Sequence, residues 1–286
     1  GIRDAQESRG LGDVYKRQVL NRNLPKETDI LVEHLIKNDG HYTDVFVVEA
    51  GSNINNLSKY STWHVNNKDV TKHGLRYLRG MNYGLMQLWN NNIWDDYDSF
   101  FLVTNDTKFP KGQETIKTLQ DLLNKDPKLG LVSPCAEKWG EKDLIGENST
   151  KYFWFIHNNA YFLRKDFINQ LINTNDPTYM DFLFDGTNFR GYLSESEFIA
   201  KTYVNNWAAA ITTQVFAEED ETYLLNKNFI IKTETYEENM ELYLDEGMKW
   251  MKKKYGFNSR WQMMQYAKLF YDKFFEYYPE CRIYKI

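Results

Sequence analysis

The stretch SFFLVTNDTKFP, residues 99–110, decides the fold class of this 286-residue chain. Its first half is an apolar run that predicts a buried β-strand, and the run stops at Asn105-Asp106-Thr107. Aspartate is poor in strands and costly to bury without a partner, so an acid at this point indicates either a ligand site or a strand-end Asx turn. The surrounding sequence has to distinguish the two.

Strand-like and helix-like segments alternate on both sides of this run. Such alternation predicts an α/β domain with a largely parallel sheet, in which the strand tips face one crevice. Glu49 ends the strand before Asp106, so we expect both acids in that crevice. The segments, in chain order, are VLNRNLP (a strand stub and a loop), ETDILVEHLIKN (helix), TDVFVVEAGSN (strand and loop), STWHVNN (short strand), GLRYLRGMNYGLMQLWNN (helix), SFFLVTNDT (strand), ETIKTLQDLLNKDP (helix) and LGLVSP (strand).

Beyond residue 135 the pattern changes to a polar loop, a strand-rich section and more helices. YFWFIHNNAYFLR predicts strand, KDFINQLINT and SESEFIAKTYVNN predict helices, and AAAITTQVF predicts another strand. From about residue 234 the chain is helical and aromatic. We expect a main domain at 19–233 and a helical extension at 234–286 that packs on it, with its aromatic side chains in the core rather than on a carbohydrate platform.

The overall composition excludes several classes of function. With 35 basic and 40 acidic residues and no basic block, the chain is a poor candidate for binding nucleic acid. Its only cysteines, Cys135 and Cys281, lack close His or Cys neighbours, so neither a disulfide framework nor a zinc site is indicated. No apolar run approaches the roughly 20 residues of a membrane span. We therefore expect a soluble, cytoplasmic protein, with peripheral association with a membrane left open.

The first eighteen residues, GIRDAQESRGLGDVYKRQ, need separate treatment because they lack an amphipathic period. They resemble translated sequencing-adaptor read-through at the end of a metagenomic gene fragment, so we interpret residues 1–18 as a non-native tail. A natural polar tail is the alternative. On the first interpretation, the opening strand of the domain is reduced to Val19-Leu20 before Asn21.

Several motifs in order resemble the family-2 glycosyltransferases. They are FVVEAGSN, RGMNYGL, the long run FFLVTNDTKFPKGQETIKTLQDLLNKDPKLGLVSP, and NNAYFLRKDFI, and together they cover roughly residues 19–220. The resemblance implies a Rossmann-like GT-A fold and a nucleoside-diphosphate sugar as donor. It also implies that six residues bind the nucleotide and its diphosphate: Glu49, Ser52, Arg79, Asn82, Asn105 and Asp106. Gly84 lies in the same helical segment as Arg79 and Asn82.

The chemistry of such a transfer explains why an acid belongs at Asp106. A nucleoside-diphosphate leaving group gains negative charge, which Mg²⁺ or Mn²⁺ stabilises, and a carboxylate at a strand tip can hold that ion. The acceptor hydroxyl must also lose a proton, which requires a base. The resemblance places this base in GYLSESEF, where Glu195 and Glu197 stand for the usual aspartates and Glu195 aligns best. A metal-binding histidine of relatives is replaced by Ala217, which two glutamates follow.

Trp154, His157 and Asn158 are candidates for the acceptor pocket, because aromatic faces and amides suit sugars. Each candidate also has a plainer interpretation. Glu49 can be a solvated loop acid, Trp154 an ordinary core residue, and Arg79 a surface residue of a helix. The two glutamates of GYLSESEF can be helix N-terminal charges, with the preceding serine as a cap.

We therefore predict an inverting glycosyltransferase that moves a sugar from a nucleotide donor to a hydroxyl of a glycan, lipid-linked or protein acceptor. A non-catalytic nucleotide-sugar or glycan-binding module is the alternative, because the acids of GYLSESEF depart from the family pattern and the metal-binding histidine is missing. An aromatic-rich structural protein is a third interpretation, and it predicts no crevice between Glu49 and Asp106.

Overall fold

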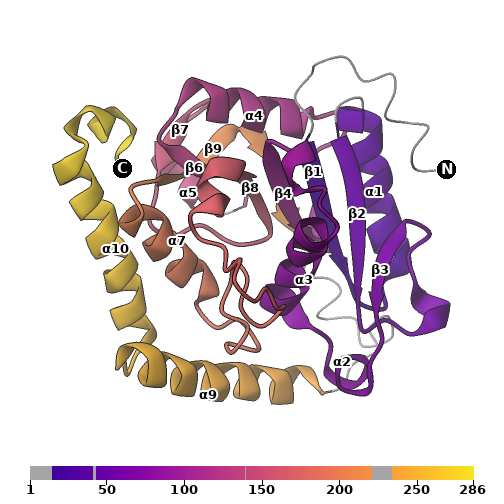
Figure 1. Cartoon of the computed structure of the whole chain (residues 1–286). Helices are drawn as coiled ribbons and strands as arrows, with labels where there is room; N and C mark the ends of the chain where they lie inside the picture. Colours follow the sequence, from indigo (N-terminus) through magenta and orange to yellow (C-terminus); the bar gives the residue numbers. More distant parts are fainter. Residues whose placement is uncertain (1–14, 41–42, 139, 221–233) are drawn as a thin grey trace.

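A central eight-stranded sheet organises the protein, as a computed structural model shows for residues 15–40, 43–138, 140–220 and 234–286 (Figure 1). The strand order is β3-β2-β1-β4-β8-β6-β9-β7, and β5 and β10 form a separate two-stranded sheet. The strands are β1 (Tyr15–Asn21), β2 (Thr43–Ala50), β3 (Ser61–Val65), β4 (Ser99–Thr104), β5 (Thr107–Lys108), β6 (Leu129–Cys135), β7 (Thr150–Tyr152), β8 (Ala160–Arg164), β9 (Ala208–Phe216) and β10 (Glu218–Glu219).

Most neighbouring strands of the large sheet are parallel. The pairs β1–β2, β1–β4, β2–β3 and β6–β9 are parallel, whereas β8 runs antiparallel between β4 and β6, and β7 runs antiparallel to β9. The predicted α/β class with a largely parallel sheet is therefore confirmed. The helices are α1 (Pro25–Asp39), α2 (Lys68–His73), α3 (Arg76–Asn90), α4 (Thr115–Lys125), α5 (Glu141–Ile145), α6 (Lys165–Asn169), α7 (Ser194–Val204), α9 (Tyr236–Tyr255) and α10 (Arg260–Tyr277), with 3₁₀ turns η3 (Ile54–Asn56), η4 (Trp94–Asp96) and η5 (Pro279–Tyr284).

Helices cover both faces of the sheet, and the alternation of side chains along β1 separates the two faces. The Arg17 side chain donates to the carbonyl of Asp39 at the end of α1, whose carboxylate in turn accepts from the Ile116 backbone of α4. Gln18, on the opposite face, donates to the Gly80 carbonyl of α3. Both faces of the sheet are thus buried, which explains the long apolar runs of strands such as β4 and β8.

The first strand is longer than the sequence predicted. Tyr15 through Asn21 pair with β2, Tyr15 through Leu20 pair with β4, and Lys16, Arg17 and Gln18 are fully buried. The expectation of a strand reduced to Val19-Leu20 is therefore wrong, since the charged residues before it occupy the centre of the sheet. The assignment of residues 1–18 to an adaptor stays a prediction, and residues 1–14 lie outside the described residues.

Two glycines allow α3 to lie close to β1. A Cβ atom at Gly80 would lie 2.3 Å from the Leu20 side chain, and one at Gly84 would lie 2.5 Å from the Gln18 side chain. Their four-residue spacing puts both on the same face of the helix. Helix α3 therefore packs directly against β1, and the two glycines make this close approach possible.

The C-terminal helices wrap one side of the sheet domain, with α9 and α10 meeting at a sharp corner (Figure 1). Thr235 and Glu238 form a capping box at the start of α9, and Gly256 ends the helix in a left-handed conformation. The α10 side chains Tyr271, Phe274 and Phe275 are buried in the same core as the sheet. The prediction that the aromatic side chains of this region belong to the core is confirmed for these three, whereas Trp261 and Tyr277 are exposed. The expected boundary at residue 233 falls outside the described residues.

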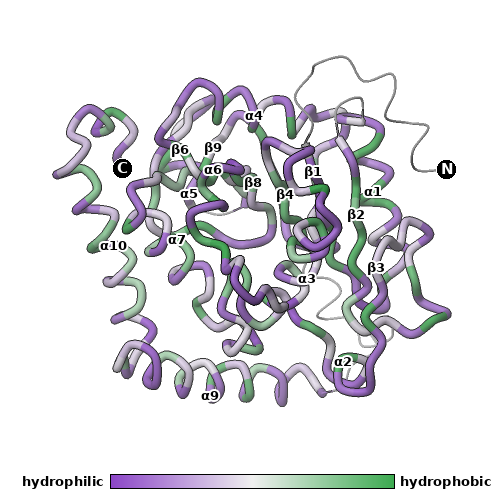
Figure 2. Tube along the Cα trace, viewed as in Figure 1, coloured by the Kyte–Doolittle hydropathy of each residue, from purple (hydrophilic) through white to green (hydrophobic). Residues whose placement is uncertain are grey.

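Hydrophobic residues concentrate along the central strands, whereas they alternate with hydrophilic ones along α9 (Figure 2). Among the described residues, no helix is both long and apolar enough to cross a membrane.

Candidate functional site

The carboxyl ends of β1, β2 and β4 meet in a small polar network. The Asn21 amide donates to the Glu49 carboxylate at 2.8 Å, and the Asn105 amide donates to the Asn21 side-chain oxygen at 3.1 Å. Asp106 directly follows Asn105, so the acid of β2 and the acid after β4 lie at one edge of the sheet. The α/β interpretation predicts that these two acids lie together at the carboxyl ends of the strands, whereas an aromatic-rich structural protein would not require it.

Glu49 is fully buried and organises the loop that follows β2. Its carboxylate accepts hydrogen bonds from Asn21, from the Ser52 hydroxyl at 2.6 Å and from the Ser58 backbone at 2.8 Å. Burial raises the pKa of Glu49, and these three donors oppose that rise. The Ser52 hydroxyl also accepts from the Asn23 backbone at 3.1 Å. Glu49 and Ser52 thus shape the loop rather than face solvent, and direct contact with a nucleotide stays a prediction for both.

Asp106 sits in the turn between β4 and β5 with a buried carboxylate oxygen, Oδ1, that has no hydrogen-bond partner among the described residues. Burial raises its pKa, hydrogen bonds with the Thr104 side chain and its own backbone N–H oppose the rise, and the charge of Asp220 adds to it. An Asx turn would engage the backbone two residues later, and the described contacts of Asp106 do not include such a bond. An orphaned, buried carboxylate oxygen is the arrangement expected where a cation binds.

Asp220 is the residue near Asp106 that the sequence did not identify. Its backbone N–H donates to the Asp106 carbonyl at 2.8 Å, because β10 pairs with β5 directly before it. The Asp220 carboxylate, which is nearly buried, forms an ion pair with Lys108. Ala217, where the resemblance implied a metal-binding histidine, is buried and has no group that binds a metal. The acidic run EED at residues 218–220 was the only sequence feature that could have indicated this contact. The pairing of β10 with β5 shows which of the three acids approaches Asp106.

The described residues contain no cluster of three or more His, Cys, Asp or Glu side chains that could hold a metal ion. Asp106 and Asp220 could supply at most two carboxylate groups to a metal ion. Mg²⁺ is often held by one or two carboxylates together with substrate phosphates and water, so this donor set fits a cation that arrives with a diphosphate.

Glu195 lies in the first turn of α7, where the chain is held in an unusual conformation. The preceding Leu193 is buried and has a φ of 53°, in the left-handed region that a leucine rarely adopts. Burial raises the pKa of Glu195 to about 7, and the opposing influences are its own backbone N–H and the charge of Arg260. A carboxylate with a pKa near neutrality suits a general base.

Glu197, the second predicted catalytic residue, has a different role. Its side chain is buried, and its Oε1 accepts from Lys254 at 2.7 Å and from the Tyr255 hydroxyl at 2.5 Å. The cap by the preceding serine, which the plainer interpretation offered, does not form: Leu193 is the N-cap residue of α7, and no side chain caps the helix. The C-terminal extension thus binds the Glu197 carboxylate, which favours a structural role, and catalysis by Glu197 stays a prediction.

The segment 156–159 connects the two halves of the candidate site. The Asn159 carbonyl accepts from the Thr107 hydroxyl at 3.1 Å, and the Asn158 amide donates to the Ser194 hydroxyl at 3.5 Å. Residues next to Asp106 and next to Glu195 are thus joined through two consecutive asparagines. These contacts link the turn after β4 with the first turn of α7, and the joint action of Asp106 and Glu195 stays a prediction.

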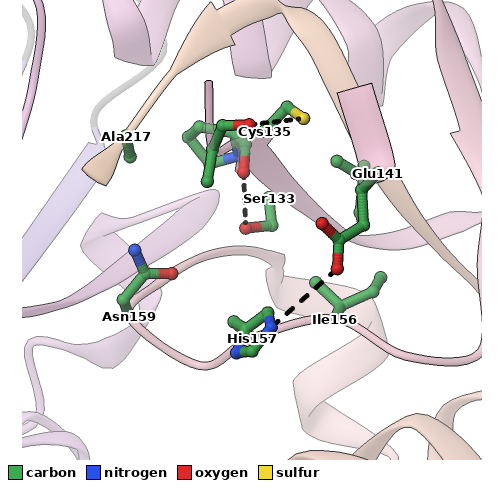
Figure 3. A pocket seen from close by; sticks show the side chains of 10 residues that line it. Ser133, Cys135, Glu141, Ile156, His157, Asn159 and Ala217 are labelled. Carbon is green, nitrogen blue, oxygen red and sulfur yellow. Dashed lines mark hydrogen bonds and ion pairs between the residues drawn. The ribbon is translucent and has the colours of Figure 1, made fainter. Parts of the chain in front are cut away.

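His157 borders a small cavity beyond the end of β6 (Figure 3). The cavity also has Cys135, Glu141 and Asn159 in its wall. The ring of His157 points toward Glu141, and their closest N and O atoms are 4.0 Å apart. Burial lowers the pKa of His157 to about 4, so the ring is neutral at pH 7. A neutral imidazole can exchange hydrogen bonds with a hydroxyl, as predicted for an acceptor pocket, and that role stays a prediction.

Trp154 packs in the aromatic core rather than lining the cavity of Figure 3. Its ring centroid lies 4.6 Å from that of Phe153 and 5.3 Å from that of Tyr271, and Lys268 lies over it. These contacts favour the plainer interpretation of Trp154 as a residue that docks α10.

Arg79 and Asn82 of α3 both contact the segment 179–190, in different ways. The Asn82 amide is fully buried, donates to the carbonyls of Tyr179 and Phe184 and accepts from the Leu183 and Phe184 backbones, so its hydrogen-bonding capacity is used within the protein. Arg79 donates to the Gly186 carbonyl at 2.7 Å. Its guanidinium lies over a phenylalanine ring, 4.5 Å from the centroid, in the wall of a cavity of about 500 Å³.

That cavity has the size of a small-molecule site and is lined mainly by residues of α2, α3, the segment 179–190 and α9. Gly74 lines it and packs against Arg22, which follows β1 directly. Of the two predicted contacts on α3, Arg79 faces this hollow and Asn82 does not line it. Asn82 instead holds the segment 179–184 in place.

Comparison with known proteins supports the fold. No protein-family model and no curated protein matches the sequence. The mannosyltransferase PcManGT from Pyrobaculum calidifontis, solved in complex with GDP-Man and Mn²⁺, is similar with a TM-score of 0.52 and 11% identity over 88% of this chain and 69% of that chain. TarS from S. aureus is similar with a TM-score of 0.51 and 13% identity over 82% of this chain and 43% of that chain. The chain therefore has the GT-A fold of nucleotide-diphospho-sugar transferases.

Proposed function

We propose that this protein is a glycosyltransferase that transfers a sugar from a nucleoside diphosphate to a hydroxyl acceptor, as the resemblance to family 2 first suggested. One observation carries the proposal: a buried oxygen of the Asp106 carboxylate, Oδ1, has no hydrogen-bond partner among the described residues, and Asp106 lies beside Asp220. The GT-A fold and the Mn²⁺ and GDP-Man bound by the similar mannosyltransferase support it.

Asp106 and Asp220 would bind a divalent cation, Mn²⁺ or Mg²⁺, together with the diphosphate of the donor. When bound, that cation supplies positive charge against which the diphosphate leaves. Asn105 keeps the Asp106 turn fixed, since its amide donates to Asn21 at 3.1 Å and to Thr28 at 3.2 Å. The donor thus meets a rigid acid at the strand tip, with the cavity beside Arg79 available for other parts of the nucleotide.

Glu195 would accept the proton of the acceptor hydroxyl. The new bond forms between the acceptor oxygen and the anomeric carbon of the sugar, the bond from that carbon to the diphosphate breaks, and the proton moves to the Glu195 carboxylate. With one base and no second nucleophile assigned, a single displacement with inversion is the simplest course. A pKa of about 7 leaves a useful fraction of Glu195 ionised at neutral pH while keeping it basic enough to accept the proton.

A donor-turnover assay tests the proposal. UDP-, GDP- and TDP-sugars are incubated with the protein and Mn²⁺, with water as the acceptor, and release of the nucleoside diphosphate is measured. We expect release from at least one donor, abolished by EDTA and reduced by 100-fold or more in Glu195→Gln. Binding of a nucleoside diphosphate and Mn²⁺ without any release would contradict catalysis and support the alternative, a nucleotide-sugar-binding module.

A further inference from the structure

The extension after residue 234 contacts the chain on both sides of Glu195. On the C-terminal side, Lys254 and Tyr255 at the end of α9 bind the buried Glu197 carboxylate, two residues beyond Glu195. The Lys254 ammonium lies 2.7 Å from Glu197, whose side chain is only 5% exposed. A buried carboxylate needs a partner, so Lys254 is essential to the charge balance of this turn of α7.

On the N-terminal side, Lys254 also forms an ion pair with Asp185, which the Trp250 indole contacts at 3.0 Å. Burial alone would raise the pKa of Asp185, but hydrogen bonds from Lys254, Thr187 and Trp250 hold it well below its ordinary value. A single ammonium therefore joins Asp185 to Glu197. Between these two acids the chain makes the turn that carries Glu195.

That turn is held against its own conformational preference. Leu193 has a φ of 53°, and such a residue persists only where its surroundings enforce it. Helix α9 supplies those surroundings, because a Cβ atom at Gly247 would lie 2.2 Å from the Tyr192 side chain. Tyr192, Leu193, Trp250, Met251 and Met263 form a separate hydrophobic cluster at this contact.

We propose that Lys254 is a positioning residue for Glu195: by joining Asp185 to Glu197 it fixes the first turn of α7 so that the base faces the acceptor. The inference rests on the proposed function. Helix α9 then acts as a support for the reacting geometry, and the extension is part of the catalytic unit. A base displaced by about 1 Å can lose roughly 100-fold in rate, which sets the size of the expected effect.

Turnover of Lys254→Met tests this role against a matched variant of the same helix. Lys249→Met removes an exposed ion pair with Asp245 and serves as the control. We expect Lys254→Met to lower kcat for Mn²⁺-dependent donor hydrolysis about 10- to 100-fold with the KM of the donor unchanged. We expect Lys249→Met to match the wild type and Lys254→Arg to recover most of the loss. Equal kcat in the Met variants, or a loss confined to KM, would overturn the assignment.

A milder variant and a structural readout keep the inference testable on its own. Tyr255→Phe removes one hydrogen bond to Glu197 without leaving the carboxylate uncompensated, and we expect a loss of about 2- to 5-fold in kcat. Hydrogen exchange of the amides in 194–199 should be faster in Lys254→Met than in Lys249→Met. If no donor is turned over by the wild type, the proposed function fails, and this exchange difference still decides whether Lys254 fixes the turn: its absence contradicts the inference.

Discussion

The backbone N–H of Asp220 donates to the Asp106 carbonyl at 2.8 Å, so two acids that are far apart in the sequence lie together after β4. Like charges that approach each other raise each other's pKa unless a cation lies between them, and Asp220 does raise the pKa of Asp106. Lys108 compensates Asp220 by an ion pair. The Asp106 oxygen Oδ1, which has no hydrogen-bond partner in the described part of the chain, lacks such compensation.

Asp220→Asn should weaken the binding of Mn²⁺ in the presence of GDP or UDP. The variant keeps the backbone bond to Asp106 but removes one carboxylate near the cation, so we expect about a 10-fold higher Kd for Mn²⁺. Glu218→Gln is the neighbouring control, because that side chain contacts the Glu137 backbone. Equal Mn²⁺ affinity in Asp220→Asn and wild type would exclude Asp220 as a ligand.

Glu195 makes the rate depend on pH near neutrality. A general base must be ionised, and its pKa is raised to about 7, so kcat/KM should rise with pH through a midpoint near 7 and level off above it. The charged and titratable groups facing this carboxylate are Arg260 of α10 and the hydroxyls of Tyr77, Tyr161 and Tyr243. A flat profile between pH 5.5 and 8.5 would contradict the assignment.

Glu195→Gln should also change stability, in the opposite direction to activity. The folded-state pKa lies above the unfolded value of 4.5, so the folded state binds more protons, and stability falls as pH rises from about 4.5 to 7. Removing the charge should therefore raise the free energy of unfolding at pH 8 by about 3 kcal/mol. Urea unfolding at pH 8 and pH 5 measures this, and an equal change at both pH values would show that burial of this charge carries no cost.

Lys16→Met should stabilise the protein at pH 7. The ammonium is fully buried in β1, donates only to Gln18 among the described hydrogen bonds, and burial lowers its pKa well below 10.5. Below pH 10.5 the Lys16 amine is protonated more fully in the unfolded state than in the folded state, so the free energy of unfolding rises with pH up to about 10.5. We expect a gain of about 1–3 kcal/mol at pH 7 that shrinks toward pH 10. Thermal unfolding at both pH values checks it, and Lys26→Met on the exposed side of α1 is the control.

Glu49→Gln should destabilise the loop after β2. Asn21, Ser52 and the Ser58 backbone all donate to this carboxylate, and an amide would turn a donor toward one of them. We expect a loss of about 1–3 kcal/mol in the free energy of unfolding. Glu33→Gln, at an exposed position of α1, provides the comparison. No loss relative to Glu33→Gln would mean that the network around Glu49 is not structural.

Local patterns predicted the α/β class because buried parallel strands and amphipathic helices leave periodic signals in the sequence. The position of β8 between β4 and β6 left no such signal, because pairing across the sheet is set by contacts far apart in the chain. The burial of Lys16 and Arg17 also escaped prediction, since composition rules assign such residues to the surface.

The candidate site shows the same division. Asp106 and Glu195 were predicted from short motifs, and the segment 156–159 contacts a sequence neighbour of each. The roles of Asp220 and Glu197 depend on a strand pairing and on a helix 57 residues away, and neither is visible locally. Asn82 has a helical position that matches a nucleotide-binding segment, yet its amide is used by the backbone of the segment 179–184.

The most direct test of the account is calorimetry of GDP and UDP binding with and without Mn²⁺, on the wild type and Asp106→Asn. We expect Mn²⁺-dependent binding of at least one nucleotide by the wild type and at least a 30-fold weaker affinity in Asp106→Asn. The variant should unfold at an equal or higher temperature, because burial raises the pKa of Asp106 and its Oδ1 has no hydrogen-bond partner among the described residues. Asp96→Asn, at an exposed position, should bind like the wild type. Equal Mn²⁺-dependent affinity in Asp106→Asn and the wild type would contradict the central claim.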